Sequence, residues 1–134
     1  MEYPFRENEN FTAEFTVSRE IYDGFIKLFG DRNPMHTDPA FAAGKGFKGV
    51  IMHGNILNGF LSYFIGEILP VKNVIIHSQE ISYRKPVYLN DRLTLKVRVS
   101  EVHESVNVAI FKFSFINGTG ETAAKGTVQT GILA

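Results

Sequence analysis

Hydrophobic and polar residues alternate along the second half of the chain. The alternation is clearest near residues 93–99 and 109–115, where an apolar side chain stands at every second position. A period of two places one set of side chains on one face of a β-strand. Short polar segments separate the stretches and read as turns. We therefore predict four strands that follow one another as an antiparallel meander, at residues 74–83, 92–102, 106–116 and 121–132.

The first half of the chain predicts one strand and three helical segments. Residues 10–17 alternate as a strand, and Ser18 then caps a short amphipathic helix that ends at Gly30. Asp38 caps a second short helix that begins with a proline. The third segment, residues 54–69, is apolar nearly all round and predicts a buried helix that Pro70 stops.

These elements predict an α+β fold in a single domain over residues 1–134. A lone long apolar helix must bury its surface, and the sheet is the only surface large enough to cover it. We expect a curved antiparallel sheet of about five strands wrapped around that central helix. Its edge strands would stay open for pairing, so we also expect a homodimer with a continuous sheet.

Composition and charge exclude several classes of function. The 134 residues are 44% hydrophobic with a formal net charge of zero, so a basic surface for nucleic acid is not expected. Cysteine is absent, which excludes disulfides and thiol chemistry. Residues 1–8 lack a signal-peptide pattern, and residues 54–69 fall short of a membrane span. We expect a cytoplasmic protein that contacts no membrane.

The segment from Gly30 to Asp38 carries the chemistry. Pro34 pushes Asn33 toward an extended conformation and predicts irregular chain here. Asp31 and His36 flank this rigid turn, so their side chains can converge on one point as an acid–base pair. An imidazole titrates near neutrality and can both take and give a proton. For each residue alone, a turn-forming or packing role is the simpler interpretation.

Gly54, at the start of the buried helix, is the second candidate. An N–H in the first helical turn has no partner within the helix and carries partial positive charge. It could donate to a carbonyl oxygen that gains negative charge, although a glycine that merely eases the chain into the helix is equally compatible. Asn55, Asn58 and Ser62 form one polar stripe on that helix.

We expect no metal and no cofactor. A metal site built from His36, Asp38 and His53 is conceivable, but the spacing matches known sites loosely. For Asp38 we favour the helix cap, and for His53 a role as a cap or packing residue. Glycine-rich phosphate loops are absent from the sequence, so a nucleotide cofactor has no support.

The runs GDRNPMHTDPAFA (30–42) and GVIMHGNIL (49–57) resemble the MaoC-like, (R)-specific enoyl-CoA hydratase family of the hotdog superfamily. The resemblance covers almost the whole chain. It implies reversible addition of water to trans-2-enoyl thioesters of coenzyme A or acyl carrier protein, and a homodimer with the substrate tunnel near the subunit boundary. One departure is Phe29, where the family tends to have a small residue.

The resemblance also assigns roles to individual residues. Asp31 and His36 would hold and activate the water, and Asn33 would help to fix the loop. The Gly54 N–H would bind the thioester carbonyl. Ser62 matches a serine near the site in the family.

Two other functions stay open from the sequence. A thioesterase of the same superfamily usually needs a carboxylate on or near the central helix, where Glu67 is the only candidate, near the helix C-terminus. A non-catalytic acyl-thioester-binding or dimerisation module would not need the intact set of Asp31, Asn33 and His36.

Overall fold

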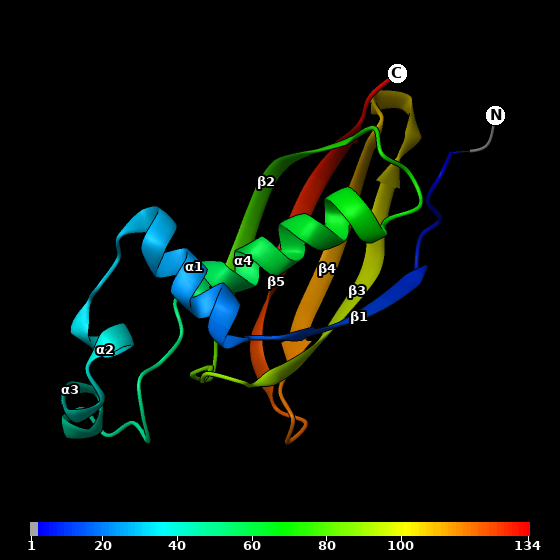
Figure 1. Cartoon of the computed structure of the whole chain (residues 1–134). Coiled ribbons are helices and arrows are strands. Elements are labelled where there is room, and N and C mark those ends of the chain that lie inside the picture. Colours follow the sequence, from blue (N-terminus) through cyan, green and yellow to red (C-terminus); the bar gives the residue numbers. More distant parts are fainter. Residues whose placement is uncertain (1–2) are drawn as a thin grey trace.

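A five-stranded antiparallel sheet forms the body of the protein. The computed structural model describes residues 3–134, so the first two residues of the predicted domain lie outside the described part. The strand order is β1-β3-β4-β5-β2, and Figure 1 shows the sheet curving around one long helix. The strands are β1 (Asn10–Thr16), β2 (Val74–Tyr83), β3 (Arg92–His103), β4 (Val108–Ile116) and β5 (Thr122–Ile132).

The helix on the concave side of the sheet is α4 (Gly54–Tyr63), which continues as one π-helical turn, η1 (Phe64–Ile68). The predicted central helix and the α+β architecture are therefore confirmed. Phe60 of α4 stacks on Phe15 of β1 with ring centroids 4.6 Å apart. No helix among residues 3–134 is long and apolar enough to cross a membrane. The sheet covers one face of α4 and η1, made of Ile56, Leu57, Phe60, Leu61, Phe64 and Ile65.

The predicted meander is wrong for its first strand. β3, β4 and β5 pair in sequence, but β2 pairs with β5 and not with β3. The segment between β2 and β3 buries Val87 and takes the chain from the β2 edge past β5 and β4 to the position of β3. The predicted turn at its end is present, with Asn90 at a positive φ of 71°, but it leads into β3 without pairing β2 to it. The other strand boundaries differ from prediction by one or two residues. The largest difference is the start of β4, because a 3-10 turn, η2 (Glu104–Val106), precedes that strand.

Three helices precede α4 and stand beside the sheet (Figure 1). They are α1 (Arg19–Phe29), α2 (Pro34–Thr37) and α3 (Pro39–Gly44). The Ser18 and Asp38 side chains cap α1 and α3 as predicted. The prediction of irregular chain throughout residues 30–38 is wrong, because Pro34 begins a single helical turn instead of preventing one. A proline fits the first helical position, where its missing N–H would have no partner.

Candidate active site

The loop after α1 fixes the first candidate residue. Gly30 ends the helix in the left-handed region, with a φ of 73°, and the chain turns outward to an exposed Asp31. A carboxylate oxygen of Asp31 accepts the backbone N–H of Asn33 at 3.2 Å. The Asn33 side chain in turn accepts the N–H of Met35 at 2.9 Å and caps α2. These two hydrogen bonds hold the loop between Asp31 and His36.

His36 lies on α2 with a defined tautomer. Its Nδ1 is 2.8 Å from the carbonyl oxygen of Ile51. A carbonyl only accepts, so Nδ1 carries the proton and Nε2 keeps a free lone pair. Tyr22 donates its hydroxyl to the His36 carbonyl and ties α2 to α1. The Asp31 carboxylate and ligand-capable nitrogens of His36 and His53 lie within 4.8 Å of one another, as predicted for the Asp31–His36 pair.

His53 joins this cluster, whereas the sequence favoured a cap or packing role and grouped it with His36 and Asp38 only as a conceivable metal site. It occupies the N-cap position of α4, but its side chain makes no capping hydrogen bond. Instead, Nε2 lies 2.9 Å from the backbone carbonyl oxygen of Asp31, and the ring stacks on His36 with centroids 4.0 Å apart. A hydrogen bond to a backbone carbonyl requires no particular residue type at the other end, so the sequence carries no signal for it.

Asp31, His36 and His53 each have an atom that could bind a metal ion. Asp38, considered from the sequence as a ligand with the two histidines, is not part of this cluster. Nδ1 of His36 and Nε2 of His53 are already committed to carbonyl oxygens. The nitrogen that His53 has left, Nδ1, is fully buried, so a metal ion could reach it only if the ring moved. Tetrahedral coordination needs lone pairs that converge on one point. The cluster therefore suits proton transfer better than metal binding.

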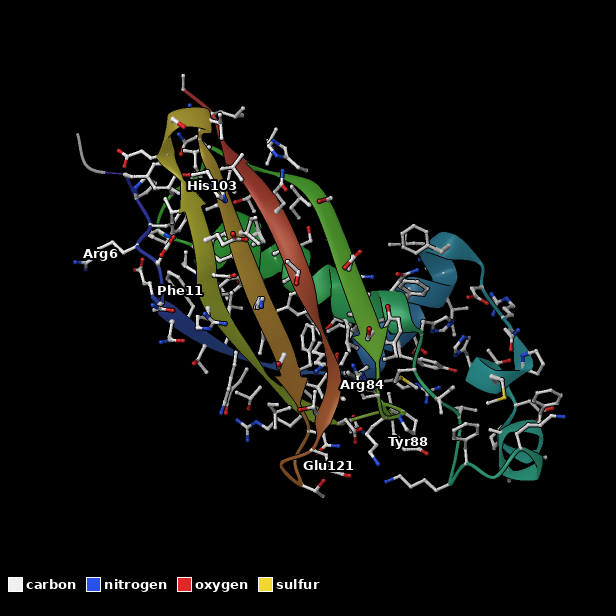
Figure 2. All side chains as sticks on the ribbon, turned by 180° about the vertical axis from the view of Figure 1, so that it is seen from behind. Arg6, Phe11, Arg84, Tyr88, His103 and Glu121 are labelled. Atoms are coloured by element: carbon white, nitrogen blue, oxygen red, sulfur yellow. The ribbon has the colours of Figure 1, made fainter. Side chains whose placement is uncertain are left out.

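A cavity of about 400 Å³ brings His36 and Gly54 together. Gly54 is the first residue of α4, so its N–H has no acceptor within the helix. A Cβ built on Gly54 would lie 2.8 Å from the Tyr83 ring, so a side chain at this position would collide with that ring. Arg84 lines the same cavity, and Figure 2 shows it with Tyr88 at the end of the sheet that also carries Glu121. A carbonyl group in this cavity would meet a helix-end donor beside a histidine.

Asp31 also borders a larger groove of about 900 Å³ between α1 and α4. Its walls include Phe25, Phe29 and Phe60. Phe29 is 71% exposed although its ring packs on Phe25 with centroids 4.9 Å apart. The groove therefore offers an apolar surface that begins at the candidate carboxylate.

The predicted polar stripe of α4 is present, but only part of it reaches the site. Asn58 donates to Asn55 at 2.8 Å and accepts from Gln79 of β2 at 2.9 Å. Ser62 is exposed and lies eight residues after Gly54, which is roughly 12 Å along a helix. It lines neither of the two cavities.

The carboxylate that a thioesterase would use is distant from this site. Glu67 lies in η1, beyond the C-terminal end of α4. Its carboxylate is exposed and faces Lys72 at 3.8 Å. Neither cavity of the site includes it, so the geometry does not favour the thioesterase.

Comparison with known proteins agrees with this architecture. The chain matches the family described as "MaoC like domain" over residues 4–115. It is 35% identical over 102 residues to the (R)-specific enoyl-CoA hydratase of Aeromonas caviae, covering 76% of each chain. A mitochondrial 3-hydroxyacyl-[acyl-carrier-protein] dehydratase of Arabidopsis thaliana is 30% identical over 97 residues, which cover 72% of this chain and 57% of that protein.

Solved structures give the same result for the fold. The structure of the (R)-hydratase from A. caviae superposes with a TM-score of 0.88 at 28% identity, covering 96% of this chain and 98% of that one. The fold is thus the hotdog fold that the resemblance implied, a curved sheet around one central helix. The chain belongs to the MaoC-like domain family.

Proposed function

We propose that this protein is an (R)-specific enoyl-thioester hydratase, a hydro-lyase that acts in the cytoplasm. It adds water reversibly to a trans-2-enoyl thioester and gives an (R)-3-hydroxyacyl thioester. The relatives named as hydratases and dehydratases support this reaction and its stereochemistry. They differ in whether coenzyme A or acyl carrier protein carries the acyl chain, and both carriers are compatible with this chain.

The proposed reaction uses Asp31 and His36 as one acid–base unit. The Asp31 carboxylate and the free Nε2 of His36 hold a water molecule between them. As the water oxygen bonds to C3 of the substrate, the pair takes one of its protons, and the C2–C3 π electrons shift toward the thioester carbonyl. The pair then gives a proton to C2. Both additions come from one face of the double bond, so the addition is syn.

Gly54 stabilises the charge that develops between these steps. The thioester oxygen becomes an enolate oxygen when C3 accepts the water, and a fixed N–H donor lowers the energy of that state. The N-terminal end of α4 adds its partial positive charge. Asn33 contributes indirectly by holding the loop between the two acid–base residues.

One observation carries the proposal. His36 belongs to the proton-transfer cluster with Asp31 and also lines the cavity that Gly54 opens into. A thioester whose carbonyl oxygen lies at Gly54 therefore places its double bond next to the acid–base pair. This proximity is what addition of water to a conjugated carbonyl requires.

The test is to mix the protein with crotonyl-CoA and to follow two signals in parallel. A hydratase removes the ultraviolet absorbance of the conjugated double bond and releases no free thiol, and chiral analysis of the product gives the (R) enantiomer. Release of thiol without prior hydration would mean a thioesterase instead. A protein that binds the thioester and produces neither signal would be a binding module.

We also propose that two copies pair through β2 to form a homodimer. β2 is an edge strand with β5 as its neighbour, and Ile75 and Ile76 on it are 43% and 38% exposed. An open edge with exposed apolar side chains favours pairing with another strand. Light scattering should give twice the mass of one chain, and a monomeric mass with full activity would contradict the dimer.

A further inference from the structure

His53 is a buried polar residue to which the proposed reaction gives no role. Only 2% of its surface is exposed. It stands where Ser, Thr, Asp or Asn would cap a helix, yet its side chain makes no such bond. An apolar residue would fill the same space without burying polar nitrogens, so packing alone does not account for a histidine here.

The His53 ring touches the acid–base pair in two ways. Its Nε2 is 2.9 Å from the Asp31 carbonyl oxygen, so Nε2 must carry the proton and donate. Its face lies against the His36 ring, with centroids 4.0 Å apart and 26° between the planes. Phe25 also packs against His53, with centroids 4.6 Å apart, and this packing restricts movement of the ring.

The other nitrogen of His53, Nδ1, indicates that the ring does not exchange protons with a substrate. Nδ1 is fully buried, and no hydrogen-bond partner for it exists among the described residues. With the proton on Nε2, Nδ1 is a lone pair without a donor in its surroundings. A buried atom with no path to water or to either cavity is badly placed to exchange protons with a substrate, because neither cavity includes His53.

The backbone around Asp31 explains why such a contact matters. Asp31 lies in an exposed loop between α1 and α2, outside any helix or strand. The hydrogen bond from His53 connects its carbonyl to the start of the central helix. A side chain on a loop without such a connection would sample many positions, and misplacement by about 1 Å can lower a rate roughly 10²-fold.

We propose that His53 is a positioning residue for the acid–base pair. Its Nε2–H holds the Asp31 backbone, and its face sets the plane of the His36 ring, while no proton passes between His53 and the substrate. This inference rests on the proposed hydratase function, but it concerns a residue that the function alone does not require. It predicts that the Nε2–H, which holds Asp31, and the ring face, which orients His36, make separate contributions that substitutions of His53 can distinguish.

Two substitutions divide the contributions. His53→Phe keeps an aromatic face and removes the donor, whereas His53→Gln keeps an amide donor and removes the ring. We expect His53→Phe to lower kcat for crotonyl-CoA about 10²-fold with KM changed less than about threefold, and His53→Gln to recover part of that loss. The pH profile of kcat should keep the shape of the unaltered enzyme. His103→Gln is the matched control, because His103 is exposed and lies at the opposite end of the sheet from Arg84 and Tyr88 (Figure 2).

A measurement on the unaltered protein does not depend on whether the variants fold. With histidine labelled with ¹⁵N, NMR should report the Nε2–H tautomer for His53 and the Nδ1–H tautomer for His36. An Nδ1–H tautomer at His53, a wild-type kcat in His53→Phe, or loss of one limb of the pH profile in that variant would each overturn the inference. Failure of the unaltered protein to hydrate crotonyl-CoA would instead contradict the hydratase function, and the tautomers would still decide the contact.

Discussion

Substitution of Gly54 by alanine tests whether a helix-end amide is part of the site. The added Cβ would lie 2.8, 2.9 and 3.0 Å from Cζ, Cε1 and the hydroxyl oxygen of Tyr83, closer than ordinary contact. Tyr83 is 51% exposed, and among residues 3–134 its hydroxyl has one hydrogen bond, a 3.4 Å contact from the Asn58 side chain. Because the ring can swing outward, we expect the free energy of unfolding to stay within about 1 kcal/mol of the original, which is also the size of the helix-propensity gain.

The effect on turnover should be much larger than the effect on stability. The new methyl group and the displaced Tyr83 ring occupy the approach to the Gly54 N–H, and loss of one such donor lowers kcat about 10²–10³-fold. The assay is the loss of enoyl absorbance with crotonyl-CoA, together with a thermal melt. Gly66→Ala in η1, the continuation of the same helix, is the matched control, because a Cβ there would meet nothing within 4 Å and Gly66 lines neither cavity of the site. Unchanged kcat in Gly54→Ala would refute the proposed role of this amide.

Three further predictions concern stability and substrate binding. Gly126→Ala should lower the free energy of unfolding in a denaturant titration by about 3 kcal/mol or more, because its Cβ would overlap the backbone oxygen of Glu80 on the neighbouring strand; an unchanged midpoint would contradict the β2–β5 register. A hydrogen bond from Thr119, followed by Lys85, lowers the pKa of Glu121 below 4.5, so Glu121→Gln should reduce the melting temperature above that pH and have no effect once the pH falls through the lowered pKa. Arg84 lines the cavity of the site, where its guanidinium could bind the phosphates of coenzyme A. Arg84→Ala should therefore raise KM severalfold for crotonyl-CoA but not for a crotonyl thioester of N-acetylcysteamine, which lacks phosphates; equal KM changes for both substrates would contradict a role in phosphate binding.

Local signals predicted most of the elements. Alternation predicted β3 and β4 because Leu93, Leu95 and Phe111 all face one buried layer. The caps at Ser18 and Asp38 were predictable because a side-chain oxygen before a helix satisfies nearby N–H groups. The partner of β2 was not predictable, since alternation defines the buried face of a strand and not its neighbour.

In the site, too, contacts between residues close in the sequence were predictable and contacts between distant residues were not. Asp31 and His36 could be paired from the sequence because one rigid turn joins them. The turn of helix at Pro34 also has a local signal, an asparagine cap followed by a first-turn proline, but proline equally ends helices, so the same residues are typical of irregular chain. The contact from His53 could not be predicted, because it depends on how α4 packs against the loop. The single-domain extent and the roles of the site residues stay predictions.

The most direct test of the account is the kcat of Asp31→Asn for hydration of crotonyl-CoA. Asparagine keeps the oxygen that accepts the Asn33 N–H, so the loop and the melting temperature should be preserved while the carboxylate is lost. We predict that kcat falls at least about 10²-fold, and that His36→Gln causes a similar loss. Full turnover by a folded Asp31→Asn protein would contradict the central claim that this carboxylate and the neighbouring imidazole activate the water.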